Sequence, residues 1–357
     1  MAQYENGVSV VICCHNSVHR LGTTLAHLVA QRVEPGLSWE VLLVDNGSTD
    51  TTASTAYNCW SRVDIPFRVV PEPRLGLSYA RQRGLAEARY PIVSFIDDDN
   101  WVCPDWVQLS ADIMGQFPSV AVCNGFAEAV CEVSPPAWFQ KCMHMYASSP
   151  NDEVGDITWA PALPSGSGLG IRKEAWNALV SKGFQFVLTG RQGGRLSSGE
   201  DSELCIALRI AGWRFWRDPR LRFQHFIEAK RLTWAYLRRL NRESAESALA
   251  IIAYEIAERG HPVRIIDRAR ETWQWQTGRT LRRLTRNTRG ALRLLFDNRE
   301  GDHQALLAET MIARLVTLLK WRTQFTSQIN QIRNSRWRKP PYANVCYAAP
   351  TDPTKAA

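Results

Sequence analysis

The sequence lacks several features that would assign the protein to a familiar class. Its nine cysteines are scattered and odd in number, with no paired C-x-x-C spacing, which argues against a disulfide framework or a structural zinc site. No run of about 18 apolar residues occurs, so no segment is expected to span a bilayer. Residues 1–7 are polar and do not have the form of a signal peptide. A reducing cytoplasm is therefore the expected location.

The composition is that of a globular protein with an uneven distribution of charge. The chain has 357 residues, 45% of them hydrophobic, enough for one large α/β domain and an appendage. Residues 1–258 hold 24 Lys and Arg against 28 Asp and Glu, whereas residues 259–340 hold 18 against 6. The basic segment suggests an anionic partner, either a lipid surface or a nucleic acid. A solvated helical surface is an equal alternative.

Short apolar runs alternate with helical patterns over the first 230 residues, which predicts βα units around a mostly parallel sheet. Strands are expected at 8–12, 41–44, 67–70, 92–96 and 220–223, and helices at 21–31, 77–89 and 204–210, with a further helix beginning near Pro104. From about Leu232 the pattern becomes helical, and Trp273, Trp275, Trp321 and Trp337 add amphipathic aromatics. The expected division is 1–230 for a catalytic α/β domain, 231–340 for a basic helical extension and 341–357 for a flexible tail.

Acidic side chains follow two of the expected strands. Asp45 ends the second strand, and Asp97–Asp99 follow the fourth. Because ligands bind beyond the carboxyl ends of strands in open α/β sheets, these residues are expected to be neighbours. Three adjacent carboxylates repel one another unless a cation offsets them, and Mg²⁺ or Mn²⁺ prefers such oxygen ligands together with phosphates. The alternative is a polar turn that caps the next helix.

A second acidic centre, Glu200-Asp201, follows a glycine-containing loop and begins a helical pattern. It is either a helix cap or a general base that deprotonates a hydroxyl. His225, after the last expected strand, is a candidate for completing a metal site. Arg74, Arg81 and Arg83 are candidates for forked hydrogen bonds to a phosphate or base, with a solvated helix face as the alternative.

Six segments in order resemble family 2 glycosyltransferases over roughly residues 8–230. They are VSVVICCHN, VLLVDNGSTDTT, RLGLSYARQRGL, IVSFIDDDN, PSGSGLGIRKEAW and GEDSELCIALRIAGWRFWRDP, and a final QHF follows them. The resemblance implies a GT-A fold, that is, a Rossmann-like nucleotide-binding sheet flanked by helices. The segments most resemble a bacterial exopolysaccharide or surface-glycan branch. There is no QxxRW motif, so the chain does not resemble a processive polysaccharide synthase.

The resemblance also implies roles for individual residues. Asp201 matches the proposed catalytic base, and Asp99 and His225 match positions at the metal. The positions matching the donor site are Asn16, Asp45, Arg81, Asp97 and Asp98, and those matching the acceptor site are Gly166, Ser167, Gly168 and Glu200. The first turn departs from the family, because Cys13-Cys14-His15-Asn16 stand where Pro-Thr-Tyr-Asn is common, so the donor base stays open.

The expected function is inverting, metal-dependent transfer of a sugar, with Mn²⁺ or Mg²⁺ as the cofactor. The donor is expected to be a nucleotide-sugar, with UDP as the family default, and the acceptor a glycan or a lipid-linked hydroxyl. A retaining enzyme of the same fold or a nucleotidyltransferase is the alternative, although no G-x-x-x-x-G-K-[ST] loop is present. Nucleic-acid binding is not expected, because no binding module accompanies the basic segment. That segment is expected to rest on the anionic inner face of the plasma membrane. The oligomeric state stays open.

Overall fold

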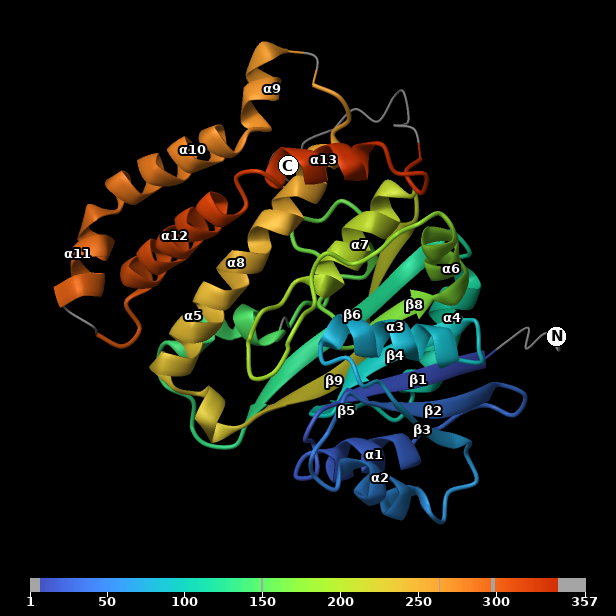
Figure 1. The fold of residues 1–357 in the computed structure, drawn as a ribbon. Coiled ribbons are helices and arrows are strands. Elements are labelled where there is room, and N and C mark those ends of the chain that lie inside the picture. Colours follow the sequence, from blue (N-terminus) through green and yellow to red (C-terminus); the bar gives the residue numbers. More distant parts are fainter. Residues whose placement is uncertain (1–6, 149, 263, 297–298, 340–357) are drawn as a thin grey trace, which may run out of the picture.

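The computed structural model describes residues 7–148, 150–262, 264–296 and 299–339. The expected tail, residues 341–357, lies outside these ranges. Within them, a central sheet carries helices on both faces, and a group of C-terminal helices extends away from it (Figure 1). The α/β class with a C-terminal helical extension is therefore confirmed.

The sheet follows the spatial order β3-β2-β1-β4-β8-β6-β9-β5, with β7 paired to β9. Its strands are β1 (Gly7–Cys14), β2 (Ser38–Asp45), β3 (Phe67–Pro71), β4 (Ile92–Asp97), β5 (Asn100–Val102), β6 (Val120–Cys131), β7 (Gly155–Asp156), β8 (Leu169–Arg172) and β9 (Arg214–Ile227). The first four strands in this order are parallel, and β8 runs antiparallel to β4. The buried runs VSVVI and VLLV form β1 and β2 because an inner parallel strand has both faces covered and needs apolar side chains throughout.

Helices cover the two faces of the sheet in two groups. One hydrophobic cluster joins the sheet to α1 (Leu21–Val29), α2 (Thr52–Trp60) and α4 (Trp106–Gln116). The other joins it to α3 (Leu77–Glu87), α6 (Lys173–Ser181), α7 (Glu200–Ile210), α8 (Trp234–Glu258) and α13 (Phe325–Arg333). The C-terminal helices α8 and α13 therefore share a core with the sheet.

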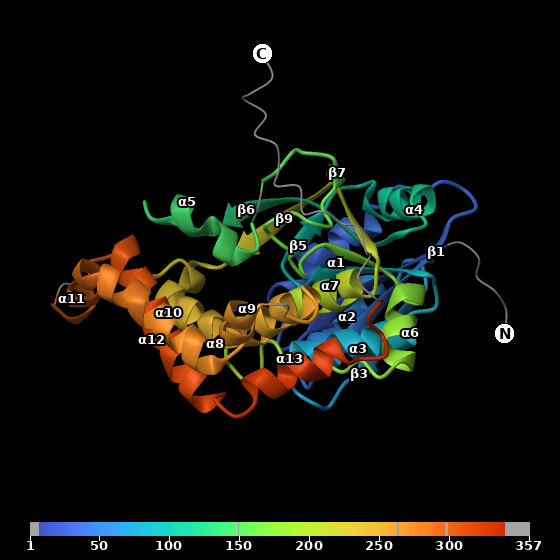
Figure 2. The same ribbon diagram turned by 90° about the horizontal axis from the view of Figure 1, so that it is seen from above.

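Seven further helices complete the described part of the fold. They are α5 (Phe139–Cys142), η1 (Met143–Tyr146), η2 (Ala229–Arg231), α9 (Ile265–Arg270), α10 (Trp273–Arg286), α11 (Thr288–Phe296) and α12 (His303–Lys320). Seen from above, α10, α11 and α12 lie at the end of the molecule away from β1 (Figure 2). In the described residues, no helix is both long and apolar enough to cross a membrane.

One local expectation and one alternative are wrong. His225 does not follow the last strand but lies within β9, which is longer than expected and pairs His225 with Asn100 of β5. The Asp triplet does not cap the following helix, because β5 intervenes and α4 begins only at Trp106. Trp337, one of the aromatics of the C-terminal segment, is 6% exposed and packs edge-on against Phe184.

Candidate active site

A cleft of about 770 Å³ opens at the carboxyl ends of β1 and β4, in the size range of ligand sites. Nine of the candidate residues line it, namely Arg81, Asp97, Asp98, Asp99, Gly166, Ser167, Glu200, Asp201 and His225. Register places Asp45 opposite Cys14 and Asp97 opposite Cys13, so the acidic turns flank β1 as expected. The candidates come from five separate parts of the sequence, and the sheet edge brings them together.

The turn that contains Gly166 and Ser167 forms hydrogen bonds with both Asp97 and Asp201. The Ser167 hydroxyl donates to Asp97 Oδ2 at 2.8 Å, and the backbone N–H of Gly166 donates to Asp201 Oδ2 at 2.6 Å. The N–H of Ser202 donates to Asp201 Oδ1 at 2.7 Å, because Asp201 lies in the first turn of α7. Neither carboxylate has a Lys, Arg or His partner within ion-pair distance in the described part of the chain. Both carboxylates are therefore held in place and yet available to a ligand.

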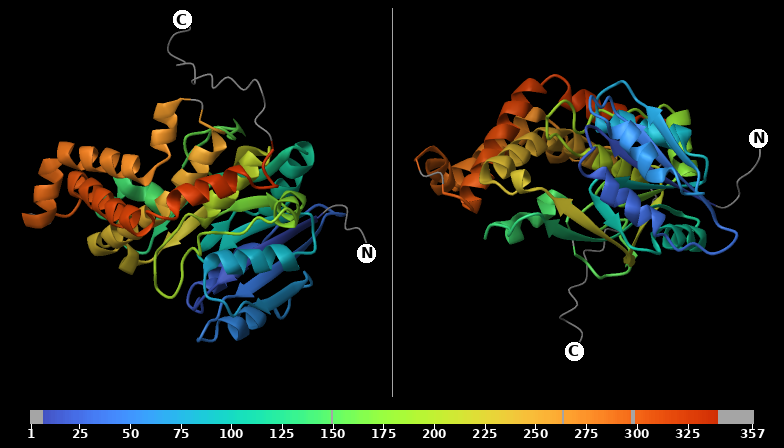
Figure 3. Two further views of the ribbon diagram at one scale, coloured as in Figure 1. Left: turned by 45° about the horizontal axis from the view of Figure 1, so that its top comes forward. Right: turned by 90° about the horizontal axis from the view of Figure 1, so that it is seen from below.

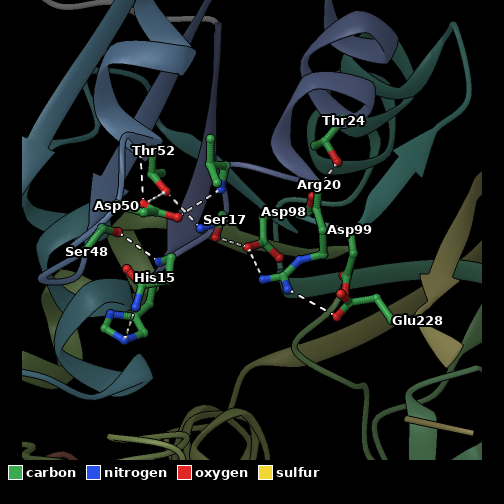
Figure 4. A network of polar contacts seen from close by, with 12 residues as sticks. His15, Ser17, Arg20, Thr24, Ser48, Asp50, Thr52, Asp98, Asp99 and Glu228 are labelled. Atoms are coloured by element: carbon green, nitrogen blue, oxygen red, sulfur yellow. Dashed lines mark hydrogen bonds and ion pairs between the residues drawn. The ribbon is translucent and has the colours of Figure 1, made fainter. Parts of the chain in front are cut away.

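Asp98 points away from this pair, toward the start of α1. Its Oδ2 lies 2.7 Å from Arg20 Nη2, and it also accepts a hydrogen bond from the Ser17 hydroxyl (Figure 4). Arg20 also contacts Glu228, at 3.3 Å. Burial and the neighbouring charge of Asp99 raise the pKa of Asp98 in spite of Arg20. The carboxylate thus anchors Arg20 at the edge of the cleft.

Asp99 is paired with two basic side chains. Arg231 Nη1 lies 3.0 Å from Asp99 Oδ2, and His225 Nε2 lies 3.5 Å from Asp99 Oδ1. All three side chains are buried. Burial opposes ionisation of Asp99, but His225 and Arg231 lower its pKa well below the usual range. Asp99 is therefore a buried anion that already has a cation beside it.

A divalent ion would have to share this position with Arg231. In the described residues, no group of three His, Cys, Asp or Glu side chains has the arrangement of a metal site. Asp99 Oδ1 and His225 Nε2 nevertheless lie side by side, and the other ring nitrogen, His225 Nδ1, is buried without a hydrogen-bond partner among the described residues. These two residues fit a divalent ion once Arg231 withdraws from Asp99.

Arg81 and Glu200 form a buried ion pair at the inner wall of the cleft. Arg81 Nη1 donates to Glu200 Oε1 at 2.8 Å, and both residues are only 4% exposed. Burial raises the pKa of Glu200 to about 6 in spite of Arg81. Within the described part of the chain its Oε2 is buried with no hydrogen-bond partner, although Glu200 lines the cleft. Arg81 is thus not on a solvated helix face, and its guanidinium contacts a protein carboxylate.

Three candidates do not line the cleft. Asp45 accepts a hydrogen bond from the N–H of Ser48, and Asn16 accepts one from the N–H of Thr49. Both shape the turns after β1 and β2. Gly168 has a φ of +69°, and a Cβ there would lie 2.5 Å from the ring of Phe223, so its role in the structure is steric. Their predicted contacts with ligands stay predictions.

Sequence reasoning missed several residues at the site. Arg20, Asn46, Tyr146, Arg231 and Tyr236 all line the cleft. Asn46 accepts a hydrogen bond from the N–H of Gly76 and donates to the carbonyls of Glu72 and Arg74, which fixes the loop before α3. Arg20 and Arg231 carry no motif, and only their buried contacts with the Asp triplet reveal them. The acidic triplet itself was the one available signal, because buried carboxylates need cationic partners.

Comparisons with known proteins agree with the expected family. A family model described as Glycosyl transferase family 2 matches residues 9–156. EpsH of Bacillus subtilis, named as a glycosyltransferase, is 28% identical over 121 residues, which is 34% of each chain. The glucosyl-dolichyl phosphate glucuronosyltransferase of Haloferax volcanii is 22% identical over 203 residues, 56% of this chain and 63% of that protein. The chain thus spans between a third and two thirds of the length of these relatives.

Solved structures show a weaker likeness. TarS 1–349 of S. aureus matches with a TM-score of 0.46 and 14% identity, over 91% of both chains. GalNAc-T7 with UDP, GalNAc and Mn²⁺ matches with a TM-score of 0.49 and 16% identity, over 74% of this chain and 54% of that one. Residues 9–156 are thus similar to glycosyl transferase family 2, and the sequence comparisons carry this likeness.

Proposed function

We propose that the cleft transfers a sugar from a nucleotide-sugar to the hydroxyl group of an acceptor. One observation carries this proposal. Asp97 and Asp201, which are distant in the sequence, face one cleft beyond the strand ends, held by Gly166 and Ser167 and without cationic partners in the described residues. One carboxylate is thus available to the donor, and the other to the acceptor.

Asp201 is the general base in this proposal. Two backbone N–H groups fix its carboxylate at the start of α7, so it can accept the proton of an acceptor hydroxyl without first reorganising. The acceptor oxygen then bonds to the anomeric carbon of the sugar, while the bond from that carbon to the phosphate oxygen breaks. The nucleoside diphosphate leaves with the electron pair. Attack from the face opposite the leaving group makes the transfer inverting.

Basic side chains around the cleft suit a departing diphosphate. Arg20, Arg191, Lys230 and Arg231 line it together with the three aspartates. Cations that are already in place stabilise charge as it develops, without a cost of reorganisation. Mn²⁺ or Mg²⁺, held by Asp99 and His225, would supply further neutralisation of the diphosphate when bound. Asn16 and Asp45 would contribute to the donor site by shaping the turns after β1 and β2. Arg81 and Asp98 would contribute through their ion pairs with Glu200 and Arg20.

For the substrates, we propose a UDP-sugar as the donor and a glycan or a lipid-linked hydroxyl as the acceptor. The relative from Haloferax volcanii is named for a dolichyl phosphate substrate, and relatives from Staphylococcus aureus are named poly-β-1,6-N-acetyl-D-glucosamine synthases. Gly166, Ser167, Gly168 and Glu200 would form the acceptor side of the cleft. The proposed place of action is the cytoplasm, with products that enter surface polysaccharides or glycoconjugates.

A panel of sugar nucleotides tests the donor proposal. One of them, with or without Mn²⁺, should raise the melting temperature by roughly 5 °C at a hundredfold excess over its Kd. Asp97→Ala should abolish this shift, because Asp97 is the cleft carboxylate assigned to the donor. Asp64→Ala, an exposed change outside the cleft, should leave it intact. A shift that survives Asp97→Ala would contradict the assignment, and no shift with any nucleotide would contradict the function.

A further inference from the structure

The segment that forms α10 and α11 is largely exposed, and all of its charged residues are basic. Residues 272–296 contain six arginines and no aspartate or glutamate. The two helices pack on α12, which packs in turn on α8, and the three form an arm at one end of the molecule (Figures 1 and 3). This arm lies outside the set of residues that line the cleft.

The outward face of α10 carries a stripe of basic and aromatic side chains. Gln276 and Thr280 are buried against the molecule. Trp275, Arg279, Arg282 and Arg286 recur every three or four residues on the opposite side of the helix, and all four are exposed. The helix therefore turns a narrow polar face inward and its cations outward.

The outward face of α11 carries exposed apolar residues. The helix packs inward through Gly290, where a Cβ would lie 2.3 Å from the carbonyl of Gln304. Leu292, Leu295 and Phe296 point away and are 56%, 74% and 83% exposed. Exposed large apolar side chains that adjoin one another are unusual on a soluble surface and mark an interaction site.

Five of the six arginines of α10 and α11 lack an anionic partner among the described residues. Arg279, Arg282, Arg283, Arg286 and Arg289 have no carboxylate within ion-pair distance in the described ranges, whereas Arg293 pairs with Asp302 at 3.1 Å. The positive charge of α10 also affects the pKa of a neighbouring arginine within the arm. Burial, and then Arg279 and Arg283, lower the pKa of Arg314 on α12. An anionic partner would relieve this repulsion.

We propose that the outward faces of α10 and α11 dock on the surface of an anionic lipid bilayer. Arginines along α10 match the anionic headgroups, and Leu292, Leu295 and Phe296 match the boundary of the acyl chains, as in helices that lie in the plane of a membrane. A nucleic acid would use the arginines but not the apolar end. A second copy of the chain would bring the same positive charge to the interface.

The docking surface is separate from the cleft, so it can be tested without a substrate. The two are linked through the core, because Leu306 of α12 belongs to the same buried cluster as Tyr146, which lines the cleft. Docking through the arm would therefore hold the catalytic part of the chain at the bilayer without burying it there. The inference stands or falls independently of sugar transfer.

Flotation of the full chain with phosphatidylcholine vesicles, with and without about 30% phosphatidylglycerol, tests the proposal. The protein should float only with the anionic vesicles. Arg282→Glu/Arg286→Glu should reduce the bound fraction by about tenfold or more, since each basic group near such a surface contributes. Arg62→Glu/Lys182→Glu, which makes the same charge change at exposed sites on the α/β domain, should leave binding near that of the wild type.

The apolar contribution has its own pair of variants. Leu292→Ser/Phe296→Ser should weaken binding to the anionic vesicles, and Val29→Ser/Val180→Ser, also exposed, should not. Circular dichroism of all variants checks that the fold is retained. Absence of flotation with anionic vesicles would overturn the proposal, as would equal binding by the arm variants and their controls. Self-association without lipid that Arg282→Glu/Arg286→Glu abolishes would instead identify a dimer interface and overturn it.

Discussion

At the scale of single residues, three consecutive aspartates have three different surroundings. Asp97 accepts from a hydroxyl, Asp98 pairs with Arg20, and Asp99 pairs with Arg231 and His225. The like charges expected to repel one another are thus offset by side chains of the protein. A divalent ion is one further cation for this cluster, and Arg231 occupies the position beside Asp99 that the ion would share.

Measurements of Mn²⁺ binding test whether a metal ion and Arg231 compete for Asp99. Arg231→Ala should tighten Mn²⁺ binding, measured by calorimetry in the presence of a nucleoside diphosphate, because it leaves Asp99 and His225 without a competing charge. Asp99→Ala should abolish metal-dependent binding of the diphosphate. Asp64→Ala, an exposed change outside the cleft, serves as the comparison. Metal binding that is indifferent to Asp99 would rule out this site.

At the scale of secondary structure, the strands were predictable because burial on both faces demands continuous apolar runs. The expected segments 8–12, 41–44 and 92–96 lie within β1, β2 and β4. The sheet edge beyond them could also be predicted, since parallel strands end on the same side. The turn at Gly166 and Ser167 shows the limit. Its small residues stood out, but its hydrogen bonds to Asp97 and Asp201 depend on tertiary packing that no local pattern encodes.

Gly166 is expected to tolerate no side chain. A Cβ there would lie 2.1 Å from Arg81 Nη2, and Arg81 is buried against Glu200, so Gly166→Ala should displace the guanidinium and leave Glu200 unpaired. Breaking a buried pair costs about 3–5 kcal/mol. Denaturant unfolding should show a loss of this order. Gly115→Ala, in α4 with open space around it, should be neutral or stabilising by up to about 1 kcal/mol. Equal stabilities of the two variants would contradict the packing described.

At the scale of the whole molecule, the C-terminal helices divide into a part that shares the core and a part that projects. From the sequence, residues 231–340 were expected to form one basic helical extension. In the structure α8 and α13 pack into the main hydrophobic cluster, whereas α10 and α11 face outward. Composition could not make this distinction, because net charge averages over buried and exposed positions.

The shared core predicts a large effect of a mutation far from the sheet in sequence. Ile329 of α13 is fully buried in the cluster that includes β1, β4 and α7. Ile329→Ala should destabilise the protein by about 2–5 kcal/mol, as for other buried aliphatic residues. Ile265→Ala makes the same change at a side chain that is 87% exposed, and it should cost under about 0.5 kcal/mol. Similar effects from both would mean that α13 does not belong to the main core.

The most direct measurement of the central claim is the rate of sugar transfer and the donor affinity of the Asp201→Asn variant, determined side by side. General base catalysis contributes about 10²–10⁴-fold, so kcat should fall by that factor. Donor affinity should remain near that of the wild type, because the Asn oxygen can still accept one of the two backbone hydrogen bonds, from Gly166 or Ser202, and Asp97 is untouched. Unchanged turnover, or a parallel loss of donor binding, would contradict the account.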